Sequence, residues 1–173
     1  MDEVGSASED LRDPSLVEVP RAIPEDAASL TRVAFAAKRH WGYPERWILR
    51  WTESLTIAPE FVRDNEVYAA TDGERIVGFH ALVGEAPQVD LEHLWVLPET
   101  MSTGVGRALF DHAMKTAAAA GAAAVKIEAD PHAEGFYERM GARRIGEEVY
   151  ELDGQRRVLP LLIAELPDRE RPG

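Results

Sequence analysis

The sequence predicts one mixed α/β domain, in which helices flank a mixed, mostly antiparallel sheet. Two Asp-Gly pairs lie between apolar runs, as expected for two β-hairpins. A strand, a glycine-containing loop and an apolar stripe with helical period follow one another, as expected for a crossover. Because hairpins and a crossover occur together, the expected order is β-α-α-β-β-β-α-β-α-β-β. We expect this domain over residues 17–166, between flexible tails at residues 1–16, which are acidic, and 167–173.

The first third of the chain is expected to contain one strand and two helices. Residues 16–23 (LVEVPRAI) have strand character. Residues 24–38 begin with a proline followed by two acidic residues, which favours the start of a helix. Residues 43–55 are predicted to form the second helix, with Trp47 and Trp51 stacked one turn apart.

The central segment is expected to hold a hairpin, a further strand and the longest helix. The hairpin turns at Asp72 and Gly73. Residues 88–97 form a strand whose second half is almost continuously apolar, so we expect it to be buried on both faces. The helix starts at Gly104, and Gly121 is suited to end it. Its apolar stripe consists of Val105, Ala108, Leu109, His112, Ala113, Ala117 and Ala120.

The last third is expected to contain a strand, a short helix and the second hairpin. The strand covers residues 123–129. The helix covers residues 133–140 and is closed by Gly141. Residues 143–152 and 156–164 pair around the second Asp-Gly turn.

Composition excludes several classes of function. The chain has no cysteine, which rules out disulfides, thiolate zinc sites and a cysteine nucleophile. Its 19 basic and 31 acidic residues give a net charge of −12, which argues against nucleic-acid binding. Such a charge would attract cations, including small amines, and the plain alternative is that it serves solubility alone. No apolar run reaches the roughly 20 residues of a membrane helix and no secretion signal is visible, so we expect a cytoplasmic protein without a membrane partner. The histidines show no metal-binding spacing, so no metal is expected.

The segment ETMSTGVGRALFDHAMK, at residues 99–115, points to an anion site. Gly104 and Gly106 open a helix after an apolar strand and Pro98, and the free N–H groups of a helix start form a cradle for an anion. A dinucleotide loop is disfavoured because Leu109 replaces its third glycine, and a nucleotide triphosphate loop lacks its Gly-Lys-Ser/Thr. The plain alternative is that both glycines only ease a turn.

Two stretches, LEHLWVLPETMSTGVGRALFDHA and VKIEADPHAEGFYERMGARRIGE, together resemble the GCN5-related N-acetyltransferase (GNAT) superfamily. The resemblance covers the expected domain and implies an acetyltransferase that uses acetyl-CoA. It also implies that main-chain N–H groups of the loop bind the pyrophosphate of coenzyme A, with Arg107 adding charge. Met101 departs from the Gln or Arg that the family usually has there. The loop residues concerned are Met101, Ser102, Thr103, Gly104, Val105, Gly106 and Arg107.

The same resemblance implies which residues meet the rest of the cofactor. Leu94, Trp95 and Val96 would supply the strand edge along which pantetheine runs, and the Val96 N–H would donate to the oxyanion. Tyr137 matches the family tyrosine that donates to the sulfur, and a phenol with a pKa of about 10 is protonated at neutral pH. The alternative for Tyr137 is a core aromatic. The remaining implied contacts are Asp130, where many relatives carry asparagine, Ala133 and Phe136.

Carboxylates on the predicted strand are candidates for the base that removes the amine proton. Glu92 is preferred, and Asp90 lies two residues before it on the same face. Glu128, at the end of the next strand, and a chain of waters are alternatives, and a salt bridge or a solvated carboxylate is the structural alternative.

The loop between the first two helices shapes the acceptor pocket in GNAT enzymes. Here it contains Trp41 and Tyr43, which would line a pocket for an amine or an aromatic group. Asp90 and Glu92 are the other residues expected to bind the acceptor. The alternative is that the aromatic residues pack the helix pair against the sheet. The acceptor is expected to be a small-molecule or peptide amine of open identity. A non-catalytic acyl-CoA-binding module and a nicotinamide-dependent enzyme are the rival functions, and exposed hairpin edges would permit a homodimer.

Overall fold

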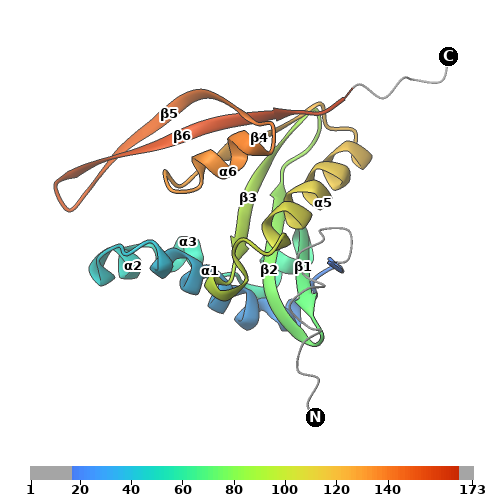
Figure 1. Ribbon diagram of the computed structural model, residues 1–173, viewed down its shortest axis with the longest axis horizontal. Coiled ribbons are helices and arrows are strands. Elements are labelled where there is room, and N and C mark those ends of the chain that lie inside the picture. Colours follow the sequence, from blue (N-terminus) through green and yellow to red (C-terminus); the bar gives the residue numbers. More distant parts are fainter. Residues whose placement is uncertain (1–16, 168–173) are drawn as a thin grey trace, which may run out of the picture. The chain divides into compact units, whose positions relative to one another are not determined.

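The computed structural model describes residues 17–167, so the predicted tail at 1–16 and residues 168–173 lie outside the described part (Figure 1). The described part confirms the predicted mixed α/β class. The elements are η3 (Pro24–Asp26), α1 (Ala27–His40), α2 (Glu45–Arg50), α3 (Thr52–Leu55), α4 (Pro59–Asp64), β1 (Glu66–Asp72), β2 (Arg75–Val83), β3 (Gln88–Val96), η4 (Pro98–Thr100), α5 (Val105–Ala119), β4 (Ala124–Glu128), α6 (Glu134–Arg139), β5 (Arg143–Leu152) and β6 (Gln155–Glu165).

The strands form a six-stranded mixed sheet in the order β1-β2-β3-β4-β6-β5. β3 and β4 run parallel, with Gln88 opposite Ala124, whereas β4 and β5 each pair antiparallel with β6. A parallel pair needs a long crossover connection, and α5 lies between β3 and β4 in the sequence. The predicted combination of hairpins and a crossover is confirmed.

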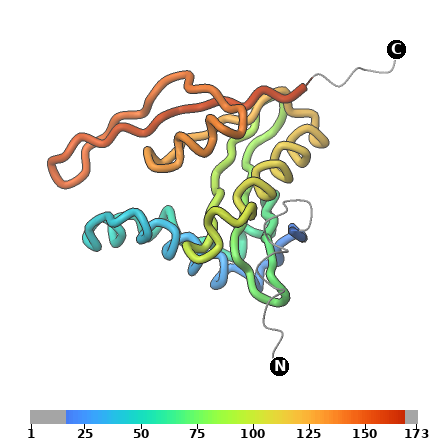
Figure 2. The backbone as a smooth tube through the Cα atoms, viewed as in Figure 1, coloured from blue at the N-terminus to red at the C-terminus, as the bar shows by residue number. Residues whose placement is uncertain are grey.

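The described chain divides into two compact units. The N-terminal unit comprises residues 17–81 and 93–112, and the C-terminal unit comprises residues 82–92 and 113–167. β2, β3 and α5 pass from one unit into the other, and the tube in Figure 2 follows the chain through them. These three elements therefore belong to both units.

The segment predicted as the first strand, residues 16–23, is not a strand in its described part. It makes isolated antiparallel bridges to β1. The Ala69 N–H donates to the Pro20 carbonyl at 3.0 Å, but Pro20 has no N–H with which to return the bond. The prediction was wrong because this proline interrupts the ladder.

The helical part of the N-terminal unit differs from the prediction at one break. α1 confirms the first predicted helix, but the helix predicted over residues 43–55 is divided into α2 and α3 at Trp51. The rings of Trp47 and Trp51 contact each other, with centroids 6.0 Å apart, but they meet edge to face at 70° and are not stacked as predicted. α4 has no counterpart among the predicted elements, and Pro59 at its first turn is the sequence signal that indicates it.

β3 is less buried than its apolar sequence predicts. Leu94 and Trp95 are half-buried, and Val96 is the buried residue of the second half. Among the described residues, the ladder between β3 and β4 covers residues 88–90 of β3 and does not include residues 94–96. Burial on both faces requires neighbours along the whole strand, so the expectation of full burial was wrong.

Both predicted hairpins and the predicted end of α5 are confirmed. Asp153 and Gly154 have φ of 51° and 75°, the left-handed conformation that a tight hairpin turn between β5 and β6 requires. Gly73 lies in the turn between β1 and β2 with φ of 63°. Gly121 follows α5 with φ of 89°, as a residue that ends a helix does.

Candidate active site

The loop before α5 contains two residues in the left-handed backbone conformation. Ser102 and Gly104 have φ of 65° and 96°, and α5 begins directly afterwards at Val105. Positive φ is strained for residues with a side chain, so the backbone itself requires the glycine at position 104. Left-handed residues at a helix start turn successive N–H groups toward one side, which creates a concave site for an anion.

The loop uses some of its N–H groups internally. The Met101 N–H donates to the Pro98 carbonyl at 3.2 Å, and the Thr103 N–H donates to the Thr100 carbonyl at 3.4 Å. Within the described residues, the N–H groups of residues 104–107 donate to no backbone carbonyl, as expected for a helix start. An anion at this point therefore meets these N–H groups first. The Met101 side chain packs against the core. The Gln or Arg that the family usually has here is therefore replaced by an apolar side chain that contributes to packing.

Gly78 of β2 allows α5 and β3 to approach closely. A Cβ atom at this position would lie 2.9 Å from Leu109 Cδ1 and 2.9 Å from the Trp95 carbonyl oxygen. Contacts this short force a neighbour to move, and a backbone oxygen in a sheet moves least easily. Gly78 was not among the residues predicted for the site, although a glycine inside an apolar strand run is a signal of close backbone approach.

A neutral histidine supports the second half of β3. Trp95 Nε1 donates to His93 Nδ1 at 3.0 Å, so the imidazole proton lies on Nε2. Burial lowers the pKa of His93 to about 4, which keeps the ring neutral at pH 7. The ring packs against Phe61 and Phe79, with centroids 5.6 Å and 5.9 Å apart. His93 therefore has a structural role here.

The candidate bases belong to one group of carboxylates in the C-terminal unit. Burial raises the pKa of the Glu92 carboxyl, and the negative charges of Asp90 and Glu128 raise it further. Asp90 lies opposite Lys126 in the ladder between β3 and β4. A raised pKa brings a carboxylate closer to the value that suits a base near neutral pH. The structure therefore couples the preferred base to both of its neighbours.

Tyr137 is buried in α6, with 6% of its surface exposed. Burial raises its pKa above the ordinary value, and the charge of Asp130 raises it further, so the phenol keeps its proton. Asp130 Oδ1 accepts the His132 N–H at 2.9 Å and lies 2.8 Å from the His132 ring nitrogen Nδ1. The Ala133 N–H donates to the Asp130 carbonyl, and the Phe136 ring contacts Tyr137. The four implied cofactor residues at 130–137 thus form one local cluster.

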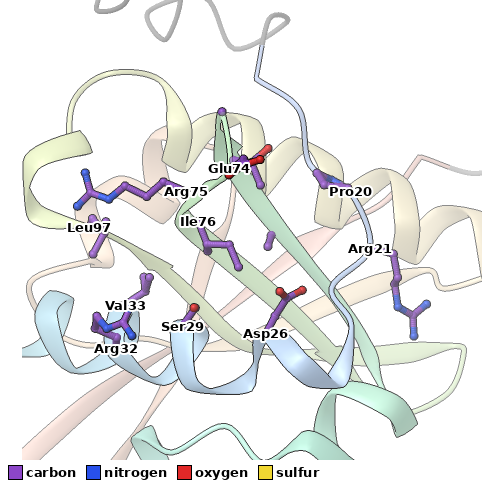
Figure 3. Close-up of a pocket in the computed structure, with 13 residues that line it drawn as sticks. Pro20, Arg21, Asp26, Ser29, Arg32, Val33, Glu74, Arg75, Ile76 and Leu97 are labelled. Atoms are coloured by element: carbon purple, nitrogen blue, oxygen red, sulfur yellow. The ribbon is translucent and has the colours of Figure 1, made fainter.

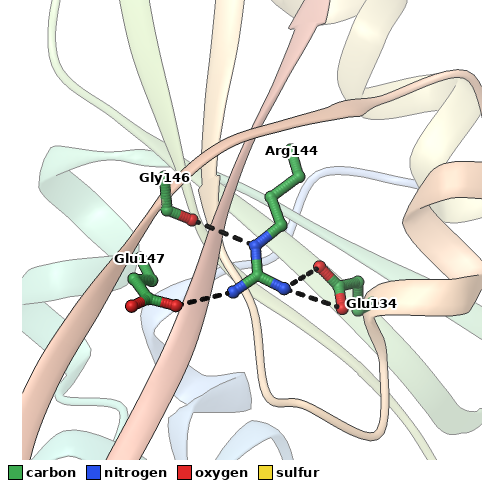
Figure 4. Close-up of polar contacts among 4 residues, drawn as sticks. All are labelled: Glu134, Arg144, Gly146 and Glu147. Atoms are coloured by element: carbon green, nitrogen blue, oxygen red, sulfur yellow. Dashed lines mark hydrogen bonds and ion pairs between the residues drawn. The ribbon is translucent and has the colours of Figure 1, made fainter.

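Arg144 ties the start of α6 to β5 (Figure 4). Its guanidinium lies 3.2 Å from the Glu134 carboxylate and 3.0 Å from that of Glu147. Its Nε donates to the Gly146 carbonyl at 3.3 Å, where the β5–β6 register shifts. Glu134 lies one turn before Tyr137, so the cluster fixes the helix that carries the tyrosine. No pattern in the sequence indicates Arg144, because its partners come from two different elements.

Tyr43 belongs to an aromatic cluster around Lys38 in the N-terminal unit. The Lys38 Nζ atom lies 4.9 Å from the Tyr43 ring centroid and 4.2 Å from that of Trp51. Lys38 is buried, so the aromatic faces replace part of the hydration of its ammonium. Tyr43 therefore contributes to the packing of the helix pair, and Trp41 contacts the His40 ring.

Within residues 17–167, no group of three or more His, Asp or Glu side chains is arranged to hold a metal ion. None of the helices in this part of the chain combines the length and the apolar character needed to cross a membrane.

A family model described as an acetyltransferase (GNAT) domain matches residues 50–157. The match covers more than half of the 173 residues, and the chain belongs to the GNAT acetyltransferase family. The resemblance found in the sequence is thereby confirmed. No curated protein matches the chain.

Solved structures share the fold. A GCN5-related N-acetyltransferase from Rhodopseudomonas palustris is 23% identical, with a TM-score of 0.74 over 87% of this chain and 96% of that one. The PaiA N-acetyltransferase from Thermoplasma acidophilum, in complex with coenzyme A, is 20% identical, with a TM-score of 0.68 over 86% and 98%. The acetyltransferase YncA from Salmonella typhimurium, with its cofactor acetyl-CoA, is 15% identical, with a TM-score of 0.65 over 91% and 98%.

Proposed function

We propose that this chain transfers an acetyl group from acetyl-CoA to a primary amine of a small molecule or peptide, by direct transfer in a ternary complex. The observation that carries the proposal is the start of α5, where Gly104 has φ of 96° and the N–H groups of residues 104–107 donate to no backbone carbonyl among the described residues. These N–H groups suit a pyrophosphate. Coenzyme A and acetyl-CoA in structures of similar fold support the same cosubstrate here.

The proposed chemistry needs a base, a donor to the carbonyl oxygen and a donor to the departing sulfur. The thioester supplies an activated acetyl group. Glu92, directly or through water, accepts the proton of the amine as its nitrogen bonds to the carbonyl carbon and the carbon–sulfur bond breaks. The Val96 N–H donates to the carbonyl oxygen. Tyr137 donates a hydrogen bond to the sulfur, and its raised pKa favours this shared proton over complete transfer.

The class of acceptor is proposed from the net charge of the chain and from the raised pKa of Glu92. A chain with a net charge of −12 attracts a protonated amine and repels an acidic acceptor. The raised pKa of Glu92 suits the deprotonation of such an amine at the site. We therefore expect cationic amines and the amino termini of peptides to be better acceptors than small amines that carry carboxylates.

The experiment is a thiol-release assay with acetyl-CoA and a panel of cationic, neutral and acidic amines. We expect release that depends on the amine. Gly104→Ala should raise the KM for acetyl-CoA about ten-fold or more, because strain at this φ displaces the N–H groups. Gly121→Ala is the matched control, since it has a similar φ of 89° at the other end of α5. Tight acetyl-CoA binding without turnover on any amine would favour the non-catalytic alternative, and no binding would refute both.

A further inference from the structure

A cavity of about 470 Å³ lies in the N-terminal unit (Figure 3). It is lined by the segment that leads through η3 into α1, by the hairpin of β1 and β2, and by the residue that follows β3. None of the residues proposed for acetyl transfer lines it. The volume falls within the range of small-molecule sites. Its apolar lining comes from Val33, Ala69, Ile76 and Leu97.

Two of the arginines that line the cavity are already engaged elsewhere. Arg21 lies 3.1 Å from the Glu66 carboxylate, and Arg75 forms an ion pair with Glu99. In Figure 3 both guanidinium groups point away from the middle of the cavity. Neither Glu66 nor Glu99 lines it. These two arginines are therefore not the groups that a ligand would meet first.

The remaining charged groups have opposite signs and come from different elements. Arg32 lies on α1 and Glu74 lies in the turn between β1 and β2. Within residues 17–167, neither side chain makes a hydrogen bond or an ion pair. Asp26 adds a second carboxylate, which caps the Ile23 N–H at 2.9 Å, and it points into the cavity in Figure 3 together with the Ser29 hydroxyl. Of the charged groups that line the apolar-floored cavity, one cation, Arg32, and two anions, Asp26 and Glu74, are therefore not held in an ion pair with a residue outside it.

We propose that this cavity binds a small zwitterion of the amino-acid type, either a free amino acid or a short peptide, at a site separate from acetyl transfer. The Arg32 guanidinium pairs with the carboxylate of the ligand. Glu74 and Asp26 face its ammonium, and the apolar floor takes an aliphatic side chain. A simple anion is repelled by the two carboxylates and a simple cation by Arg32, so a ligand that carries both charges fits best.

Isothermal titration of the full chain without acetyl-CoA tests the proposal. The probes are L-leucine and glycyl-L-leucine, compared with 4-methylpentanoate, which lacks the ammonium, and L-leucinamide, which lacks the carboxylate. We expect at least one zwitterion to bind at low millimolar concentration or better, and each single-charge analogue to bind about three- to ten-fold more weakly. Equal binding of either analogue, or no binding of both zwitterions, would overturn the proposal.

Variants assign the binding to this cavity. Arg32→Gln and Glu74→Gln should each weaken the zwitterion about three- to ten-fold. The exchange Arg32→Glu with Glu74→Arg should restore binding, because the ligand can reverse its direction. Arg156→Gln and Glu53→Gln remove exposed charges that do not line the cavity and should change nothing. Unchanged affinity in both single variants would place the ligand elsewhere and overturn the proposal. Because acetyl transfer is not measured here, failure of the proposed enzymatic function would leave this result intact.

Discussion

The Nε2 atom of His80 on β2 lies 2.9 Å from the Nδ1 atom of His112 on α5. The Tyr68 ring packs against both imidazoles, with centroids 5.4 Å and 4.6 Å away. His80 is completely buried, and burial, followed by the charge of His112, lowers its pKa to about 3. The pair therefore joins α5, the helix proposed to hold the cofactor, to β2 of the sheet. His80 takes part in this contact in its neutral form.

We expect stability to fall as the pH drops below about 6.5, the ordinary histidine value. The folded pKa of His80, about 3, lies below that value, so the unfolded chain binds the proton more readily. Protonation therefore favours unfolding between about pH 6.5 and 3. Urea unfolding at pH 7.5 and pH 5 should show a loss on the order of 1–2 kcal/mol from His80. His80→Gln should flatten this dependence, whereas His40→Gln, on the exposed end of α1, should not. Equal slopes in the two variants would contradict the prediction.

Gly78→Ala should destabilise the fold and weaken acetyl-CoA binding together. The added methyl would lie 2.9 Å from both Leu109 Cδ1 and the Trp95 carbonyl oxygen. Overpacking of this kind costs about 1–3 kcal/mol, measured by urea unfolding. Gly146→Ala is the control, because nothing lies within 4 Å of its added Cβ. If both variants lose the same stability, the close approach at Gly78 is unimportant.

Asp90→Asn should move the acidic limb of the kcat/KM profile to lower pH. Burial is the largest cause of the raised pKa of Glu92, and the charge of Asp90 is the next. Removing that charge therefore lowers the pH at which Glu92 becomes a base. Glu92→Gln should abolish this limb and lower kcat/KM. Glu85→Gln, an exposed carboxylate between β2 and β3, should leave the limb in place. A limb that persists unchanged in Glu92→Gln would assign the base to another group.

Tyr137→Phe should lower kcat by about ten-fold or more, because the departing sulfur loses its donor. The raised pKa of Tyr137 predicts that the wild-type rate does not fall through loss of its proton up to about pH 10. Tyr150→Phe, on β5, is the matched control and should keep the wild-type kcat. Steady-state kinetics at saturating acetyl-CoA measure both effects, and a wild-type kcat in Tyr137→Phe would refute the role of the phenol.

Arg144→Gln should destabilise the protein more than Arg143→Gln. Arg144 contacts two carboxylates and a carbonyl and reaches α6, whereas Arg143 pairs with Glu165 on the neighbouring strand. Both arginines are exposed, so we expect a loss of about 0.5–1 kcal/mol for Arg144 and less for Arg143. A double-mutant cycle with Glu134→Gln measures the coupling, which should shrink at high salt. A coupling near zero would mean that the cluster does not fix α6.

Local patterns in the sequence predicted the elements that depend on neighbouring residues. The Asp-Gly turns fixed both hairpins, since a tight hairpin turn needs left-handed residues at defined positions. The helical stripe predicted α5, because the helical period alone reveals an amphipathic face. Local patterns did not predict the outcome in the first segment, where Pro20 interrupts the ladder, and they did not indicate the break at Trp51 between α2 and α3.

The candidate site was predicted in part. The glycine loop and the cluster at residues 130–137 were visible because their residues are close in sequence. Arg144 and the pair of His80 with His112 were not visible, because each acts through a partner 10 to 32 residues away, and Gly78 left only the general signal of a glycine inside an apolar strand run. The burial of β3 was overestimated for a related reason, since burial depends on neighbouring elements.

The sequence by itself indicated the family, through the resemblance of its motifs, most of the helices and strands, and the chemistry available without cysteine. Those properties follow from residue identity and short-range periodicity, which the chain carries before it folds. Only the tertiary structure decided which carboxylates raise the pKa of Glu92, which ring lies next to His80, and which arginine along the cavity has no ion-pair partner. Such partners are brought together by the packing of distant segments, and no local pattern records that packing.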